Sequence, residues 1–287
     1  DVYFTSILRD STGKKLSKSL GNSPDPIELF EKYGTDATRF SIMLMSPQGS
    51  DVYFSENSLE IGRNFMNKIW NASRFIMINH EEDFTDTIDT ESLDIYDRWI
   101  LSKLDTTLEK VNIHYDNYQF NEAIKVIYDF TWNEFCNWYI EIAKIKFNSS
   151  DQLEKNNAFL VSKEVLKKVL LILHPIAPFI TEEIWSYLKN DTDTDIIIAP
   201  WPTGSFDSLK YDEAKVISLK EAVVAIRTIR SELNVAPTKK IDASISVKNN
   251  EDELLFDSLK SMIMALANLE SLDIKINLEK PEQSAVG

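Results

Sequence analysis

A short cationic loop near the start of the chain has the residue types that phosphate chemistry needs. It runs from Gly13 to Gly21 in the order Gly-Lys-Lys-Leu-Ser-Lys-Ser-Leu-Gly, and Asn22 follows it. Glycine permits backbone conformations that other residues disfavour, and lysine ammonium groups can stabilise negative charge that develops on phosphate oxygens. The loop therefore predicts nucleotide chemistry, whereas the central Lys-Leu-Ser-Lys-Ser run by itself is also typical of a solvated basic turn.

Two further blocks follow the loop at short spacing: Asp25-Pro26, and then residues 33–39 with the sequence Tyr-Gly-Thr-Asp-Ala-Thr-Arg. In this order the segment resembles the signature loop of class I aminoacyl-tRNA synthetases, usually written KMSKS, with Leu16 in place of the methionine. Leucine keeps an apolar side chain of similar size at that position. The resemblance assigns Lys15 and Lys18 to the phosphates of ATP as catalytic residues, which stabilise the charge that builds up as pyrophosphate leaves.

Longer stretches extend this resemblance over nearly the whole chain. They are residues 49–55 leading into 62–75, then 132–141, 174–183 and 226–230. Among class I synthetases these stretches are similar to the valyl-tRNA synthetase family rather than to its isoleucyl, leucyl or methionyl relatives. That family joins valine to tRNA(Val) with ATP, through valyl-adenylate. The resemblance therefore implies ATP, valine and tRNA(Val) as substrates of the full-length enzyme.

One expected helix carries a face that could read unstacked bases. Lys68, Asn71 and Arg74 stand at i, i+3 and i+6, with Phe75 at i+7, so cations, an amide and an aromatic ring can share one face. A ring offers a stacking surface to a base, and an amide offers a donor and an acceptor to a base edge. Because the helical bundle of the family binds the anticodon, we expect tRNA anticodon binding here. The alternative is that Phe75 packs inward.

The sequence also leaves alternatives open. The chain begins at Asp1, within an expected strand at residues 2–4 and without an initiator methionine, which predicts an excerpt from a longer protein. It lacks a His-x-Gly-His motif, the other half of the family's ATP site. We therefore expect valine–tRNA ligase activity from the full-length parent and none from this fragment. The two rival hypotheses are a fragment of an isoleucyl-type synthetase, against which residues 62–75 weigh, and a non-catalytic helical module that binds tRNA or acts as a scaffold.

Helical periodicity predicts the elements that position these residues. Apolar residues recur at steps of three and four, and the chain contains only seven glycines. We predict a mainly α fold: an antiparallel helical bundle, of the type that binds the anticodon in class I synthetases, with a small C-terminal α+β appendage. Helices are expected over residues 59–78, 93–111, 121–145, 165–173 and 179–188. The tryptophans of these stripes are expected in the core: Trp99, Trp132, Trp138 and Trp185.

The same patterns divide the chain into five segments. Residues 1–22 are expected to end a catalytic domain, residues 23–60 to form a connecting segment like a stem-contact region, and residues 61–190 to form the anticodon-binding bundle. Residues 191–211 contain repeated aspartate, threonine and proline, which is typical of a linker. The remaining residues, 212–287, alternate between helical and strand patterns and predict the small α+β subdomain.

Composition narrows the function further. The net charge of −15 argues against a surface that binds polyanions throughout. Basic residues nevertheless gather in residues 9–19, 59–80 and 220–240, which favours contact with a polyanion at a few chosen places, although any one of these islands can also be a solvated surface. No apolar run reaches the roughly 20 residues of a membrane span, and no signal peptide is evident, so we expect a cytoplasmic monomer without a membrane partner. A single cysteine, Cys136, and three separated histidines predict no metal site.

Overall fold

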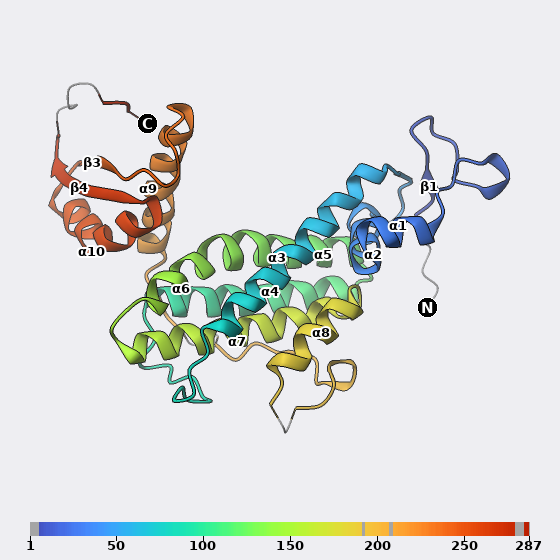
Figure 1. The fold of residues 1–287 in the computed structure, drawn as a ribbon, viewed down its shortest axis with the longest axis horizontal. Coiled ribbons are helices and arrows are strands. Elements are labelled where there is room, and N and C mark those ends of the chain that lie inside the picture. Colours follow the sequence, from blue (N-terminus) through green and yellow to red (C-terminus); the bar gives the residue numbers. More distant parts are fainter. Residues whose placement is uncertain (1–5, 191–192, 207–208, 279–283, 287) are drawn as a thin grey trace. The chain divides into compact units, whose positions relative to one another are not determined.

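The computed structural model describes residues 6–190, 193–206, 209–278 and 284–286 and confirms a mainly α protein (Figure 1). The expected strand at residues 2–4 lies outside the described residues. The chain forms two compact units. One comprises Asp1–Leu93 and Ile100–Leu209, and the other comprises Asp94–Trp99 and Lys210–Gly287.

The N-terminal part of the first unit contains more regular structure than the sequence indicated. Strand β1 (Leu8–Arg9) pairs in parallel with β2 (Val52–Tyr53). Helix α1 (Pro26–Tyr33) is capped by Asp25, whose carboxylate accepts the N–H of Ile27. Proline suits the first helical position because an N–H there would have no partner within the helix. Gly34 ends α1 with a φ of 94°, and α2 (Thr35–Met45) follows directly. The sequence predicted only a connecting segment for residues 23–60.

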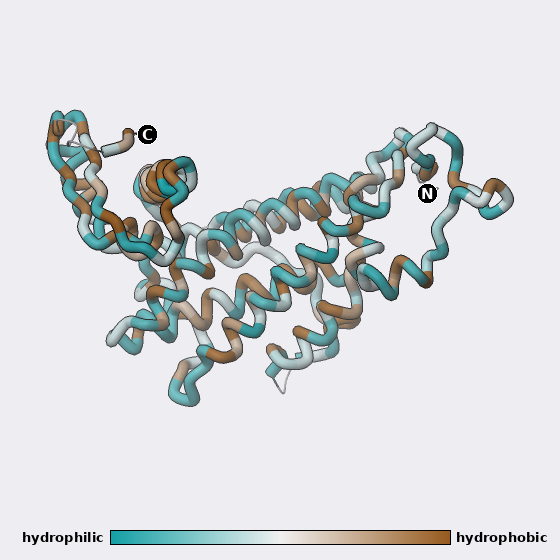
Figure 2. Tube along the Cα trace, turned by 45° about the horizontal axis from the view of Figure 1, so that its top comes forward, coloured by the Kyte–Doolittle hydropathy of each residue, from teal (hydrophilic) through white to brown (hydrophobic). Residues whose placement is uncertain are grey.

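The bundle follows as a series of helices. These are α3 (Leu59–Ile78), α4 (Ile95–Asp116), α5 (Phe120–Asp129), α6 (Ile140–Phe147), α7 (Gln152–Leu173) and α8 (Pro178–Leu188). Residues Phe130–Tyr139, between α5 and α6, form a π-helix, so that α5 and α6 belong to one uninterrupted helical segment. The three- and four-residue periodicity predicted one helix across this stretch and did not reveal the wider turn. Figure 2 shows apolar residues recurring along the bundle helices, as the stripes predicted.

Burial separates the tryptophans into two groups. Trp99 and Trp185 are 1% and 3% exposed, as expected for core residues. Trp132 and Trp138, which lie in the π-helix, are only half-buried, so the expectation was wrong for these two side chains. The reason is that the π-helix changes the angle between successive side chains, and a residue spaced for the core of an α-helix then turns toward the surface.

Helices α2 and α3 cross at very short range because Gly62 lies at the crossing point. A Cβ atom at Gly62 would lie within 3.0 Å of the backbone of Ala37 and of the Ser41 hydroxyl. The N–H of Gly62 donates to the Ser41 Oγ at 3.0 Å. The absence of a side chain on Gly62 therefore sets the distance between the α1–α2 pair and the bundle.

The segment expected to be a linker makes specific contacts with the bundle in its described part. The indole of Trp185 donates to the carbonyl of Thr194 at 3.0 Å, and the Lys168 ammonium donates to the carbonyl of Thr203 at 3.1 Å. The Asp105 carboxylate accepts the N–H of Ser205 at 3.0 Å. Residues 194–205 are thus anchored along the first unit. The boundaries assigned to the five segments remain predictions.

The second unit contains a strand–helix–strand arrangement preceded by a long helix. Helix α9 (Glu213–Glu232) leads to β3 (Ile241–Val247), α10 (Asn250–Ala267) and β4 (Leu269–Ile276), and the two strands pair in parallel. The buried guanidinium of Arg230 joins these parts, because it donates to the carbonyls of Ala236, Pro237, Lys239, Ala267 and Asn268. The α+β appendage predicted from the sequence is therefore present, and Asp94–Trp99, which includes the first residues of α4, belongs to the same unit.

Candidate functional site

The cationic loop projects from the short β1–β2 sheet and presents its lysines to solvent. Lys15 lies in an isolated bridge with Arg9, and Lys18 begins a single 3₁₀ turn, Lys18–Leu20. Both lysine side chains are exposed, and neither has an ion-pair partner within the described ranges. Gly13 and Gly21 adopt φ values of 84° and 66°, in the left-handed region where glycine carries no steric penalty. The loop can therefore offer two cations to an anionic ligand.

The base of the loop is fastened to the sheet. The Arg9 Nε lies 2.6 Å from the Asp51 carboxylate, and its Nη1 donates to the Gly13 carbonyl at 3.0 Å. Leu16 is half-buried, and its N–H donates to the Leu8 carbonyl at 2.9 Å. These contacts hold the base of the loop against the short sheet, and the side chains of Lys15 and Lys18 remain exposed to solvent.

The second predicted face lies on α3, and its four residues are not equally accessible. Asn71 and Arg74 are exposed and occupy the solvent side of the helix. Lys68 is half-buried: its Nζ donates to the Asn137 Oδ1 at 3.0 Å and lies 5.3 Å from the centre of the Trp132 ring. Within this face, Asn71 and Arg74 are the side chains most available to an outside ligand.

Phe75 lies at the edge of this face and contacts α6. Its ring meets Phe147 edge to face at 5.6 Å between centroids, and the Lys144 ammonium lies 5.7 Å from its centre. Lys144 also pairs with Glu141 at 2.7 Å. Phe75 is half-buried: it packs on Phe147 of α6, and part of the side chain remains accessible. Whether it stacks on a base stays a prediction. A neighbouring cation beside the ring is compatible with a stacked base.

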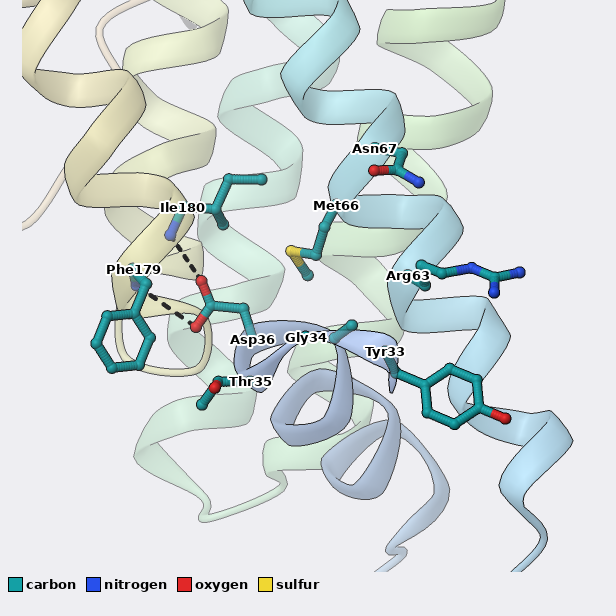
Figure 3. A pocket seen from close by; sticks show the side chains of 10 residues that line it. Tyr33, Gly34, Thr35, Asp36, Arg63, Met66, Asn67, Phe179 and Ile180 are labelled. Atoms are coloured by element: carbon teal, nitrogen blue, oxygen red, sulfur yellow. Dashed lines mark hydrogen bonds between the residues drawn. The ribbon is translucent and has the colours of Figure 1, made fainter. Parts of the chain in front are cut away.

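A pocket of about 330 Å³ lies beyond the N-terminal part of this face (Figure 3). Its lining comes from the end of α1, from α2 and α3 and from the start of α8, and includes Arg63, Asn67 and Phe179. The buried Asp36 accepts the N–H of Ile180 at 2.6 Å and that of Phe179 at 3.4 Å. Burial raises the pKa of Asp36, and these N–H donors oppose that effect. The Asp36 carboxylate therefore caps the N-terminus of α8, although Ile180 lies 144 residues further along the chain.

Arg39 makes a second link between α2 and the bundle. Its Nε donates to the carbonyl of Ile176 at 2.8 Å, and its Nη2 donates to that of Pro175 at 3.3 Å. His174, at the end of α7, is 2.7 Å from the Thr181 hydroxyl, and burial lowers its pKa. Asp36 and Arg39 were not singled out from sequence, although they lie in the block at residues 33–39. Nothing in the local pattern indicates partners so distant along the chain.

The basic island at residues 220–240 is largely used inside the second unit. Arg230 is buried, Arg227 donates to the Leu266 carbonyl at 2.8 Å, and the Lys220 ammonium lies 4.3 Å from the centre of the Trp99 ring. Lys239 and Lys240 have exposed side chains. This island therefore offers less cationic surface than its composition suggested.

Three further properties of the part of the chain that the structure describes concern metal binding, thiol reactivity and membrane crossing. No group of three or more histidine, cysteine or acidic side chains there is arranged to hold a metal ion. Cys136 is buried, which raises its pKa to about 12 and keeps the thiol protonated. Among the described helices, none combines the length and the apolar character that crossing a membrane requires.

Comparison with known families agrees with the arrangement of these parts. Residues 97–246 match the family described as the anticodon-binding domain of tRNA ligase, and residues 1–55 match the class I tRNA synthetases for isoleucine, leucine, methionine and valine. The first match covers more than half of the chain. The chain therefore belongs to the anticodon-binding domain family of tRNA ligases, and its N-terminal loop and β1–β2 region are of the class I synthetase type. Helix α3 lies between the two matched regions.

Individual relatives narrow this class. The chain is 39% identical over its whole length to the valine–tRNA ligase of Fusobacterium nucleatum, and it spans about a third (33%) of that protein. It is 38% identical to the valine–tRNA ligase of Aquifex aeolicus, with 95% of the chain and 24% of the relative covered. The valine–tRNA ligase of Geobacter sulfurreducens is 40% identical, with 100% of the chain and 33% of the relative covered.

A solved structure supports the fold. The LeuRS of Agrobacterium radiobacter K84, determined in a ternary complex with tRNA and LeuAMS, superposes with a TM-score of 0.57. The match covers 97% of this chain and 33% of that protein, at 17% sequence identity. This likeness confirms the class I synthetase fold expected from the sequence.

Proposed function

We propose that this chain is the tRNA-recognition portion of a valine–tRNA ligase, and that the full-length enzyme joins valine to tRNA(Val) with ATP through valyl-adenylate. The observation that carries the proposal is the similarity to valine–tRNA ligases, at 37% to 40% identity over 95% to 100% of the chain. Its match to the anticodon-binding domain family supports tRNA as the partner. A cytoplasmic location and a monomeric state remain predictions.

In this proposal the loop contributes to amino-acid activation. Lys15 and Lys18 contact the phosphates of ATP and stabilise the negative charge that grows on the leaving pyrophosphate. Their exposure and their lack of ion-pair partners in the described ranges support this role, because each ammonium is available to an anion without first breaking a salt bridge. The remaining parts of the ATP and valine sites would lie elsewhere in the full-length enzyme.

The face on α3 contributes the recognition of the anticodon. Arg74 and Asn71 would contact base edges, the accessible part of Phe75 would stack on a base, and Lys68 would support this face through Asn137 and Trp132. Contacts to phosphates give affinity without sequence information, whereas contacts to splayed bases create specificity. This division predicts that variants of the face change discrimination more than overall binding.

The test measures binding of the chain to a tRNA(Val) anticodon stem-loop and to one with the last two anticodon bases changed. Arg74→Ala is expected to reduce the difference in binding free energy by about 1 to 3 kcal/mol, the value of one good base contact. Phe75→Leu keeps apolar contact with Phe147 and removes the stacking surface, so it is preferable to Phe75→Ala, which would also leave Phe147 without its partner. Phe75→Leu should also reduce the difference in binding free energy between the two stem-loops.

Lys239→Ala is the matched control, because it removes an exposed cation on the second unit. It should weaken binding of both stem-loops equally or not at all. Folded Arg74 and Phe75 variants that keep full discrimination would remove these residues from the site. Equal binding of both stem-loops by the unmodified chain would favour the scaffold hypothesis.

The enzymatic part is tested in the full-length protein by valine-dependent exchange between ATP and pyrophosphate. Lys18→Ala should lower kcat with little change in the KM for valine, because a contact made mainly in the transition state affects turnover rather than binding. Exchange driven by isoleucine in preference to valine would support the isoleucyl-type hypothesis. Exchange by this chain alone would contradict the expectation that it lacks half of the ATP site.

A further inference from the structure

A hydrogen bond between the side chains of Asp10 and Asn22 joins the two ends of the cationic loop. Asp10 stands three residues before Gly13, the start of the loop, and Asn22 directly follows Gly21 at its end. The Asn22 Nδ2 donates to the Asp10 Oδ2 at 2.7 Å and lies 3.3 Å from the Lys15 carbonyl. This pair closes the loop across twelve residues and reaches the backbone of a predicted phosphate-binding lysine.

The second oxygen of Asp10 organises the first half of the loop. Its Oδ1 accepts the N–H of Thr12 at 2.9 Å, the hydroxyl of Thr12 at 2.7 Å and the N–H of Lys14 at 3.0 Å. These hydrogen bonds, with that from Asn22, hold the pKa of Asp10 at about 2. The carboxylate is therefore ionised at any physiological pH and fixes the backbone that leads into Lys15.

The acceptor side of Asn22 organises the second half. Its Oδ1 accepts the N–H of Ser17 at 2.9 Å, one residue before Lys18. The turn that carries Lys18 is closed by the N–H of Gly21, which donates to the Lys18 carbonyl at 3.2 Å. One amide group thus fixes the backbone beside both lysines: its donor side reaches Lys15 and Asp10, and its acceptor side reaches Ser17.

We propose that Asp10 and Asn22 are positioning residues that hold Lys15 and Lys18 in the arrangement needed for phosphate contact. This inference rests on the proposed function of the loop. Asp10 cannot be a phosphate ligand itself, because its charge would repel the anion and its oxygens are occupied within the loop. It acts by fixing the loop backbone before the reaction, and an error of about 1 Å in the position of a catalytic group can cost roughly 100-fold in rate.

The experiment exchanges the two side chains in the full-length enzyme. Asp10→Asn places two amides opposite each other, and Asn22→Asp places two carboxylates opposite each other. The double variant Asp10→Asn/Asn22→Asp restores one donor and one acceptor across the pair and keeps an acceptor for Ser17, although it removes the donor that lies 3.3 Å from the Lys15 carbonyl. Asp25→Asn is the matched control: Asp25 caps α1 through Ile27, and asparagine also caps helices well.

Each single variant is expected to lower kcat for valine-dependent pyrophosphate exchange roughly 10- to 100-fold, with the KM for valine unchanged. The double variant should recover part of this loss, because it regains the paired contact but not the donor to the Lys15 carbonyl, and Asp25→Asn should behave like the unmodified enzyme. A merely structural role would change the thermal stability of both single variants without this recovery of kcat. Single variants with normal kcat, or a double variant as slow as either single one, would overturn the proposal.

A second measurement keeps this test separate from that of the proposed function. In the unmodified chain, the amide protons of Lys14 and Ser17 should exchange slowly with deuterium, because both are hydrogen-bonded. Exchange should become at least tenfold faster in each single variant. It should be slow again in the double variant, because both amides regain their hydrogen-bond acceptors. Unchanged exchange would overturn the pairing of Asp10 with Asn22. Absence of pyrophosphate exchange in the unmodified enzyme would instead contradict the proposed function.

Discussion

Replacement of Gly62 by alanine tests how the loop-bearing part of the chain is attached to the bundle. At the crossing of α2 and α3, a new Cβ would lie within 3.0 Å of the Ala37 carbonyl and the Ser41 hydroxyl, where ordinary contacts begin at 3.4 Å. The Ala37 obstacle is backbone, which cannot rotate away as a flexible side chain can. The two helices must therefore move apart, and Gly62→Ala should destabilise the first unit.

Two destabilising contributions and one stabilising contribution set the change in the free energy of unfolding. Overpacking of a tight contact costs about 1 to 3 kcal/mol, and disturbance of the buried hydrogen bond from Gly62 to Ser41 costs about 1 kcal/mol. Alanine offsets about 1 kcal/mol of this because it favours the helix more than glycine does. Because the obstacle is backbone, we expect a net loss of about 2 to 3 kcal/mol. Asn64→Ala, at an exposed position of α3, should instead stabilise by about 0.5 kcal/mol.

The assay is urea unfolding of the chain followed by circular dichroism, with amide hydrogen exchange to locate the change. Protection should fall in α2 and α3 of the Gly62→Ala variant and stay unchanged in β3 and β4 of the second unit. If Gly62→Ala is as stable as the unmodified chain, or is stabilised like Asn64→Ala, the close crossing described above is wrong.

Further expectations concern single polar groups. Asp36→Ala should destabilise the first unit to urea by about 1 to 2 kcal/mol, because the first turn of α8 loses its cap; an unchanged midpoint would contradict this. Arg230→Lys should lower hydrogen-exchange protection in α10 and β4, since an ammonium cannot reach five carbonyls; equal protection would contradict it. Cys136 should resist thiol reagents at pH 8 until urea unfolds the chain, because burial raises its pKa to about 12. The pKa of Asp10 lies near 2, below its ordinary 3.8, so its contribution to loop order should persist above pH 4 and disappear as the pH falls through 2, measurable from its carboxyl carbon resonance.

The sequence determined the features that depend on neighbouring residues. Helix α3 begins and ends where its apolar period does, and β3 follows the alternating pattern of residues 241–247. The loop lysines and the two glycines around them are also readable from sequence, because a turn of this kind is specified by its own residues. The family resemblance also rests on contiguous motifs, which can be read directly from the sequence.

Only the tertiary structure decided which of these residues face a ligand and which hold the fold together. Lys68 and Arg74 have the same charge and lie on the same helix, yet Lys68 is engaged by Asn137 and Arg74 is exposed. Asp36 caps a helix that begins 142 residues later, and Arg230 gathers carbonyls from two separate segments. Local sequence cannot specify such partners, because burial and hydrogen bonding depend on which distant segment packs alongside, and that is fixed only when the whole chain has folded.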